Sequence, residues 1–248
     1  MAFGIPGVDS SCAVTSELIG QASGQFGAAP AFWGRYFTSP TTGGSVEYRH
    51  AAENGPLNAA GIRVLPVARQ TGRVGGTAAD GAQDAALNAA DFLGTFGSAV
   101  LAAQGGVFLM FLDVEGAPSL SADYYTGWAQ GLASAGNAAA GSVTLRPCLY
   151  AAQGDAATWA ALAQAMAAGA ACAGVWVARY LDSGCEQIPA WDDEFVTPAG
   201  GVPSTILAWQ YAGNCNGGAL DLSQTNPGID GQGLLLNLLV LPPTPAVS

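Results

Sequence analysis

Short runs of β-branched, aromatic and other apolar residues alternate along the chain with longer stretches that are rich in alanine. The apolar runs predict strands and the alanine-rich stretches predict helices, and this alternation indicates βαβ units and a parallel sheet. Eight strands are predicted, at residues 4–9, 32–37, 62–68, 107–114, 143–150, 174–180, 205–211 and 219–222.

The clearest helical patterns cover residues 81–94, 122–135 and 155–168. Ser121 is expected to cap the second of these helices, and Asp155 opens the third. A shorter helix is predicted over residues 51–61, where Gly61 ends it just before the next strand.

Eight strands with intervening helices fit either a closed barrel or a doubly wound open sheet. The barrel is favoured because the strands are evenly spaced, no Gly-x-Gly-x-x-Gly follows the first strand, and polar residues end nearly every strand. We therefore predict an α/β fold, a single (β/α)8 TIM-type barrel, regular or irregular, over residues 1–241. The proline-rich tail, 242–248, is expected to be extended, either packed on the domain or leading to a further segment.

Composition narrows the classes of function. The chain has 248 residues, half of them hydrophobic and a tenth charged, which is typical of one globular domain. Its net charge of −11 disfavours nucleic acid and anionic membranes as partners. All seven basic residues are arginine, so a lysine Schiff base and a P-loop lysine are excluded.

Histidine and cysteine usage limits the metal and redox chemistry. The lone histidine, His50, cannot build a multi-histidine zinc site and is interpreted as a solvated helix residue. Cys148 and Cys172 are predicted to be small buried hydrophobes. Cys185 and Cys215 lie in loops after neighbouring strands and can form one disulfide, but five cysteines in a dispersed pattern leave the redox compartment open.

Neither end of the chain predicts a targeting segment. The first residues lack a basic region followed by an apolar run, so no secretory signal is expected. No segment approaches the roughly 18 uninterrupted apolar residues of a membrane span. Localisation is therefore left open, and an extracellular or cell-envelope location would require another export route.

An abrupt change from apolar to acidic residues marks the end of the fourth predicted strand. Asp113 and Glu115 are two residues apart, so on an extended strand both carboxylates point to the same side, with Cα atoms roughly 6.6 Å apart. Repulsion between paired carboxylates leaves an acid beside a base, which is the arrangement that glycoside hydrolysis needs. Asp9 and Asp221 are expected to close a ring of acids from the first and eighth strands. The alternative is that these acids simply turn the strand ends outward.

Aromatic residues also gather at the predicted strand ends, where they suit stacking on sugar rings. Some, such as Trp176 in the middle of a strand, are assigned to core packing instead. The predicted substrate-binding residues are Asp9, Asp221, Arg35, Tyr150, Arg179, Tyr180, Trp209, Gln210 and Tyr211.

Several of these strand ends carry a family resemblance. Gly-Val-Asp, Asp-Val-Glu, Leu-Tyr, Val-Trp-Val-Ala-Arg-Tyr and Trp-Gln-Tyr followed by Leu-Asp-Leu resemble, in order, the family 25 glycoside hydrolases, the lysozymes of the Chalaropsis type. Gly-Arg-Tyr-Phe and Leu-Asn-Ala-Ala-Gly-Ile-Arg-Val-Leu-Pro-Val resemble a related glycoside-hydrolase-like barrel family of unknown function. The resemblance covers nearly the whole chain.

The resemblance implies a hydrolase of a bacterial cell-wall or related glycan that needs no cofactor and no metal. It implies that Glu115 is the general acid and that Asp113 assists by orienting an acetamido group or stabilising charge. Asp9 and Asp221 would line the same cleft.

The chain departs from the lysozyme pattern in its second and third strands, where Arg35, Arg69 and Arg73 add positive charge near the predicted cleft. These arginines would serve an anionic glycan, or they would lock the acids into ion pairs and leave the site inert. Two further alternatives stay open: a catalytically silent glycan-binding or structural barrel, and a hydrolase that binds magnesium or calcium through carboxylates alone.

Overall fold

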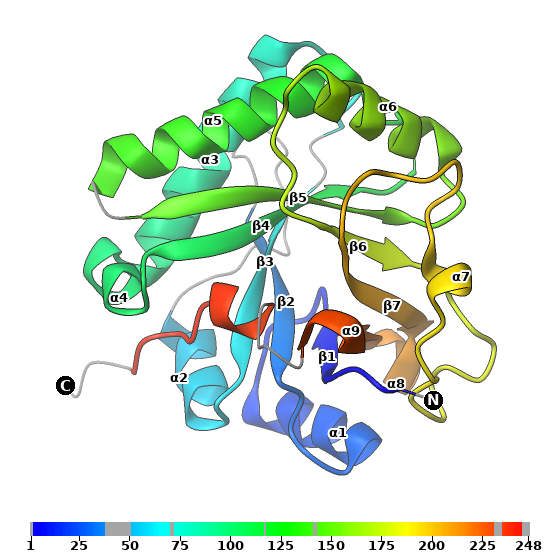
Figure 1. The fold of residues 1–248 in the computed structure, drawn as a ribbon. Coiled ribbons are helices and arrows are strands. Elements are labelled where there is room, and N and C mark those ends of the chain that lie inside the picture. Colours follow the sequence, from blue (N-terminus) through cyan, green and yellow to red (C-terminus); the bar gives the residue numbers. More distant parts are fainter. Residues whose placement is uncertain are drawn as a thin grey trace.

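Eight strands close into a barrel in the order of the sequence, from β1 round to β8, in the computed structural model of the chain (Figure 1). The structure describes residues 2–37, 51–69, 72–116, 118–140, 143–230 and 235–244. The strands are β1 (Pro6–Asp9), β2 (Phe32–Phe37), β3 (Arg63–Ala68), β4 (Val107–Val114), β5 (Thr144–Ala152), β6 (Val175–Ala178), β7 (Ile206–Asn214) and β8 (Leu220–Thr225).

Helices connect the first seven strands and cover the outside of the barrel (Figure 1). Tight turns and short helices complete the chain beyond β6. The helices are α1 (Ser16–Phe26), α2 (Ala51–Ala59), α3 (Ala78–Phe96), α4 (Ser98–Ala103), α5 (Ala122–Ala140), α6 (Ala156–Ala167), α7 (Asp193–Val196), α8 (Cys215–Gly218), α9 (Pro227–Asp230) and η2 (Leu236–Leu238).

The closed sheet confirms the predicted α/β barrel and excludes the doubly wound alternative. All eight predicted strands are present, and the bounds of β2 and β4 agree with the prediction to the residue. The predicted caps are also observed: the Ser121 hydroxyl accepts from the Tyr124 backbone N–H at 3.0 Å, and Asp155 accepts from the Thr158 N–H at 3.1 Å.

The barrel departs from the regular (β/α)8 pattern at its last strand. β8 pairs antiparallel with both β7 and β1, whereas the other neighbours run parallel. Only α8 and Ala219 separate β7 from β8, too short a connection for the crossover that a parallel strand needs. Asn214 and Asn216 adopt positive φ angles of 59° and 51° in this turn, a conformation that asparagine tolerates better than most residues. The amino end of β8 therefore lies at the rim formed by the carboxyl ends of the other strands.

Side chains fill the barrel interior in alternating positions along each strand. Trp176 lies in this interior, where its ring centroid is 6.0 Å from that of Phe111 and 4.4 Å from that of Tyr150. The interior is therefore a packed core, and Trp176 packs within it as predicted. Its buried members also include Phe32, Leu65, Val67, Leu109, Cys148 and Ala208.

The carboxy-terminal segment closes the end of the barrel opposite the rim. Leu235 and Leu239 belong to the interior core, and Val240 forms a β-bridge with Val64. Gln104 holds the backbone of Leu241 through both its amide oxygen and its amide nitrogen. The predicted tail begins within this packed segment, since Pro242 is buried, and residues 245–248 lie outside the described part of the chain. None of the described helices is long and apolar enough to cross a membrane.

Helices α3 and α5 approach each other closely at two glycines. A Cβ added to Gly127 of α5 would overlap the backbone oxygen of Ala78, and one added to Gly81 would overlap that of Tyr124. These glycines therefore allow the two helix backbones to approach closely. Gly94, also in α3, is exposed, and a Cβ there would meet nothing within 4 Å.

This difference between glycines predicts opposite effects of the same substitution. Gly127→Ala should lower the free energy of unfolding by about 1–3 kcal/mol, because the added methyl group forces α3 and α5 apart. Gly94→Ala, the matched control, should raise it by about 0.5–1 kcal/mol through better helix propensity. Urea unfolding of both variants measures the two values, and equal effects would contradict the close packing of the helices.

Candidate active site

Four carboxyl groups come together at the rim of the barrel. Asp9 ends β1 and lies directly opposite Asp221 of β8 in the antiparallel register. Asp113 lies near the end of β4, and Glu115 follows that strand directly. Each of the other three acids acts electrostatically on Asp9, so the predicted ring of acids is assembled around it.

Gly34 of β2 provides the space that Asp9 occupies. A Cβ on Gly34 would lie 2.6 Å from the Asp9 Cβ and 3.5 Å from the Trp176 ring. Any larger residue at this position would push the Asp9 carboxyl out of place. The acid cluster therefore requires a residue without a side chain at position 34.

The four acids differ in their access to solvent. Asp9 and Asp113 are only 3% and 4% exposed, Asp221 is half-buried, and Glu115 is exposed. Glu115 borders a cavity of about 490 Å³ between the loops that follow β4, β5 and β6. It is therefore the member of the cluster best placed to meet a ligand from solvent. The cavity is lined by Val114, Glu115, Gly116, Ser119, Ala152, Asp155, Ala178 and Tyr180.

Burial and like charge disfavour ionisation within the cluster. Burial raises the pKa of Asp9 well above its ordinary value, the charge of Asp221 raises it further, and a hydrogen bond from Gln210 opposes the rise. Burial also raises the pKa of Asp221, against a backbone N–H of Asn214 that donates to its Oδ1 at 2.6 Å. Burial and the approach of the two carboxyls therefore disfavour the state in which both are ionised.

A hydrogen-bond network of five side chains crosses the barrel and joins two of the acids. The amide Nε2 of Gln210 donates to Oδ1 of Asp9 at 2.8 Å. The hydroxyl groups of Tyr150 and Tyr180 lie 2.6 and 3.0 Å from the amide oxygen of Gln210. The Tyr150 hydroxyl also lies 2.9 Å from Oε1 of Glu115. Gln210, Tyr150 and Tyr180, which were predicted as substrate-binding residues, therefore lie beside the acids.

Tyr36 is a residue of this site that the predicted set omits. Burial and the charges of all four acids raise its pKa, which places its hydroxyl among them. The strand pattern contained the signal: Gly34 faces Asp9, so on β2 the residue two positions further points to the same side.

Arg35, which was predicted as a substrate-binding residue, lies away from the cleft. Its guanidinium is 1% exposed and contacts both carboxylate oxygens of Glu53, a residue of α2 on the outside of the barrel. It also donates to the carbonyl oxygens of Ser10 and Cys12. Arg35 therefore joins β2, α2 and the loop after β1.

Three further predicted substrate-binding residues lie on the outer side of the sheet, away from the cleft. Trp209 and Tyr211 flank Gln210 on β7 and are buried with ring centroids 5.9 Å apart. Arg179 stacks 3.5 Å above the ring of Phe195 and donates to its carbonyl oxygen at 2.7 Å. Because adjacent strand residues face opposite ways, only Gln210 of this trio on β7 reaches the interior.

The arginines that suggested an anionic glycan are engaged elsewhere. Arg73 forms ion pairs with Asp80 and Asp84 of α3, and the Tyr124 hydroxyl also donates to Asp84. Arg35 is likewise paired with Glu53. Two of the three arginines that were expected to serve an anionic glycan are therefore bound to other acids. Arg69, which follows β3, donates its backbone N–H to the carbonyl oxygen of Phe37, and one of its guanidinium nitrogens is buried. His50 lies outside the described residues.

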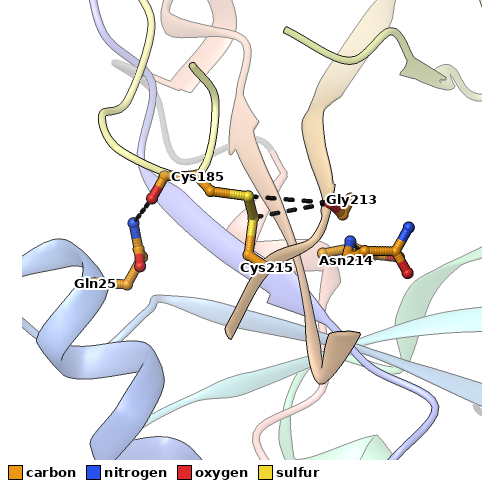
Figure 2. Close-up of a disulfide and its surroundings, with 6 residues drawn as sticks. Gln25, Cys185, Gly213, Asn214 and Cys215 are labelled. Atoms are coloured by element: carbon orange, nitrogen blue, oxygen red, sulfur yellow. Dashed lines mark hydrogen bonds between the residues drawn. A yellow bond between two sulfur atoms is a disulfide. The ribbon is translucent and has the colours of Figure 1, made fainter. Parts of the chain in front are cut away.

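A disulfide supports the turn that presents Asp221, and Figure 2 shows its surroundings. It joins Cys185, in the loop after β6, to Cys215 directly after β7, as the sequence allowed. Asn214, whose N–H binds Asp221, is the neighbour of Cys215. On the other side, Gln25 of α1 donates to the carbonyl oxygen of Cys185. The disulfide thus ties the loop after β6 and helix α1 to the Asp221 side of the rim.

The three remaining cysteines are not bonded to one another. Cys148 is buried as predicted, Cys172 is half-buried and Cys12 is exposed. Over the described ranges, no group of three or more histidine, cysteine, aspartate or glutamate residues is arranged to hold a metal ion.

Comparison with known proteins places the fold. No protein-family model and no curated protein matches the sequence. An uncharacterized protein from B. stearothermophilus is 24% identical, covers 96% of this chain and 100% of its own, and superimposes with a TM-score of 0.69. The spore cortex lytic enzyme SleM of Clostridium perfringens is 14% identical over 92% of this chain and 69% of its own, with a TM-score of 0.54.

A family 25 glycosyl hydrolase from Bacillus anthracis is 14% identical over 90% of this chain and 89% of its own, but its TM-score is only 0.48. At these identities the comparisons establish the fold alone. The resemblance to the family 25 glycoside hydrolases implied a barrel, and the closed sheet confirms it. The similar structures share this fold with the chain at low sequence identity.

Removal of the Cys185–Cys215 disulfide should destabilise the chain. The bridge closes a loop with a sequence separation of 30, so Cys185→Ser/Cys215→Ser should lower the free energy of unfolding by about 3–4 kcal/mol. Cys12→Ser, at an exposed free cysteine, is the control and should change it by less than about 0.5 kcal/mol. Denaturant unfolding measures both, and an unchanged double variant would show that the bridge adds no stability.

Neutralising Asp9 should stabilise the chain at neutral pH. Because its pKa is higher in the folded chain than its ordinary value of 3.8, the folded state holds a proton that the unfolded state has lost, and stability falls as pH rises between the two pKa values. Asp9→Asn should therefore gain about 1 kcal/mol or more near pH 7 and lose this gain below 3.8. Urea unfolding across this range tests it, with exposed Asp182→Asn as control. A loss of stability at neutral pH would contradict the expected cost of the buried charge.

Proposed function

We propose that this chain is a glycoside hydrolase that cleaves a bacterial cell-wall or related glycan, with Glu115 as the general acid. The observation that carries the proposal is the contrast within the acid cluster. Glu115 is exposed at the border of a cavity, while Asp9 and Asp113 lie buried beside it. An exposed acid backed by buried carboxyls suits proton donation to a bound sugar chain.

In the proposed reaction the proton of Glu115 passes to the glycosidic oxygen as its bond to the anomeric carbon breaks. Asp113 points to the same side of the strand and stabilises the positive charge that develops on the sugar, or orients an acetamido group that does so. Water then adds its oxygen to the anomeric carbon and returns a proton to Glu115. Asp9 and Asp221 add to the negative field that favours this charge.

A neutral glycan suits the cavity better than an anionic one. Asp155 lines the cavity together with Glu115, and Arg35 and Arg73 are bound to other acids. Tyr180, 52% exposed at the cavity, offers an aromatic face to a sugar ring. The similar structure from Clostridium perfringens is that of a spore cortex lytic enzyme, which supports a wall glycan or peptidoglycan fragment as the substrate class.

A second candidate is a catalytically silent glycan-binding or structural barrel. The burial of Asp9 and Asp113 favours it, because a carboxyl that is 3–4% exposed has little contact with a ligand unless the site opens. This module would bind wall fragments without cleaving them, so binding and turnover separate the two candidates.

Glu115→Gln should lower the rate of wall lysis about 10²–10⁴-fold, because the amide cannot donate an acidic proton. Turbidity loss of purified bacterial walls measures the rate, and release of reducing ends identifies the cleaved bond as glycosidic. Glu17→Gln, an equal change of charge on exposed α1, should lyse walls at the wild-type rate.

The outcomes distinguish the candidates. Lysis by wild type that survives Glu115→Gln would remove Glu115 from the general-acid role. Wild type that binds wall fragments without releasing reducing ends would establish the silent module instead.

A further inference from the structure

The hydrogen bonds around Gln210 have a fixed direction. Its Nε2 faces Oδ1 of Asp9 at 2.8 Å, and a carboxylate oxygen accepts hydrogen bonds. The amide oxygen of Gln210 therefore faces the opposite way, toward the hydroxyl groups of Tyr150 and Tyr180. Gln210 is 1% exposed, so the surrounding core keeps the side chain in this orientation.

A hydroxyl that binds the amide oxygen of Gln210 must donate its hydrogen, and Tyr180 also lies within hydrogen-bond reach of Tyr150. An amide oxygen has two lone pairs and no hydrogen, so it can accept from both hydroxyls at once. The Tyr150 hydroxyl is the closer of the two, at 2.6 Å against 3.0 Å for Tyr180. The single hydrogen of Tyr150 is thus directed to Gln210.

This direction decides how Tyr150 contacts Glu115. The Tyr150 oxygen lies 2.9 Å from Oε1 of Glu115, close enough for a hydrogen bond, but its own hydrogen already points to the nearer acceptor. It offers Glu115 a lone pair only. A hydrogen bond in this contact then requires a protonated carboxyl on Glu115, because an ionised carboxylate has no hydrogen to donate.

We propose that Gln210 is a positioning residue, which turns Tyr150 so that it accepts a hydrogen bond from the protonated carboxyl of Glu115. The chain of donors then runs from Glu115 through Tyr150 and Gln210 to Asp9, and it holds the proton on Glu115 until a glycosidic oxygen occupies the cavity. The delivery of the Glu115 proton to a glycosidic oxygen rests on the proposed function, whereas the direction of the hydrogen bonds does not.

Other titratable groups face the same carboxyl and must stay constant in any test. They come from several strands around the rim, while β7 contributes the neutral Gln210. They are Asp9 of β1, Tyr36 of β2, Asp113 of β4, Tyr150 of β5, Tyr180 after β6 and Asp221 of β8, with Asp155 on the same cavity.

Neutron diffraction of deuterium-exchanged wild-type crystals tests the direction of these hydrogen bonds and needs no measurement of activity. The expected density places the Tyr150 deuterium on the line to Gln210 Oε1, and a deuterium borne by Glu115 on the line to Tyr150. A Tyr150 deuterium that points to Glu115, or a Gln210 amide with its nitrogen toward Tyr150, would overturn the proposal.

The pH dependence of wall lysis tests whether Gln210 and Tyr150 hold the proton on Glu115. In Gln210→Leu the Tyr150 hydrogen is free to bind ionised Glu115, so the basic limb of the rate profile should move to lower pH by about one unit. Tyr150→Phe removes the acceptor altogether and should move the limb the same way, which gives a second variant if Gln210→Leu does not fold. The control, Tyr180→Phe, also loses a bond to Gln210 but none to Glu115, and should leave the limb in place whatever its effect on the rate.

The positioning role would be refuted if the basic limb of the rate profile kept its pH in both Gln210→Leu and Tyr150→Phe. It would also be refuted if the limb moved equally in Tyr180→Phe. Wild type that releases no reducing ends would refute the proposed function instead, and the neutron result would still decide the direction of the hydrogen bonds.

Discussion

The reversal of the last strand is the constraint on which the acid cluster depends. An antiparallel pair places opposite residues on the same face with Cβ atoms about 4.5–5.5 Å apart, so Asp221 of β8 must meet Asp9 of β1. A parallel last strand would carry its amino end, and Asp221 with it, to the far end of the barrel. The reversal brings two carboxyls into mutual repulsion, and Gln210 and the Asn214 backbone each supply a hydrogen bond that offsets part of it.

Such a cluster opposes folding, and the surrounding barrel tolerates it through packing. Gly34 clears space for Asp9, Trp176 fills the interior beneath it, and the segment around Leu239 seals the opposite end. Buried acids at a rim, supported by a well-packed core, are the pattern expected where a site sacrifices stability for chemistry. The acid cluster and the barrel therefore depend on the same few contacts near the rim.

Local sequence patterns were enough to predict the strands and the meeting of the acids, but not the directions of all side chains. The apolar run of β4 ends abruptly at Asp113, which located both the strand and the cluster. The direction of β8 was hidden, because its alternation is the same read forwards or backwards. On β7, strict alternation of inward-facing and outward-facing residues would have predicted that Gln210 faces the interior and that Trp209 and Tyr211 do not. The partner of Arg35 is on a helix 18 residues away, and only the packing of α2 on β2 brings the two together.

The bridge between Cys185 and Cys215 has a consequence for recognition. The connection between β6 and β7 carries Tyr180 near its start, and it is fastened at Cys185 to the turn beside Asp221. Beyond that point, Phe195 packs against Trp209 and against Arg179. This side of the rim is thereby preorganised: its ordering entropy is lost when the chain folds rather than when a ligand arrives. A ligand at this side of the rim would therefore meet a surface whose shape is already set, with the Tyr180 hydroxyl held on Gln210.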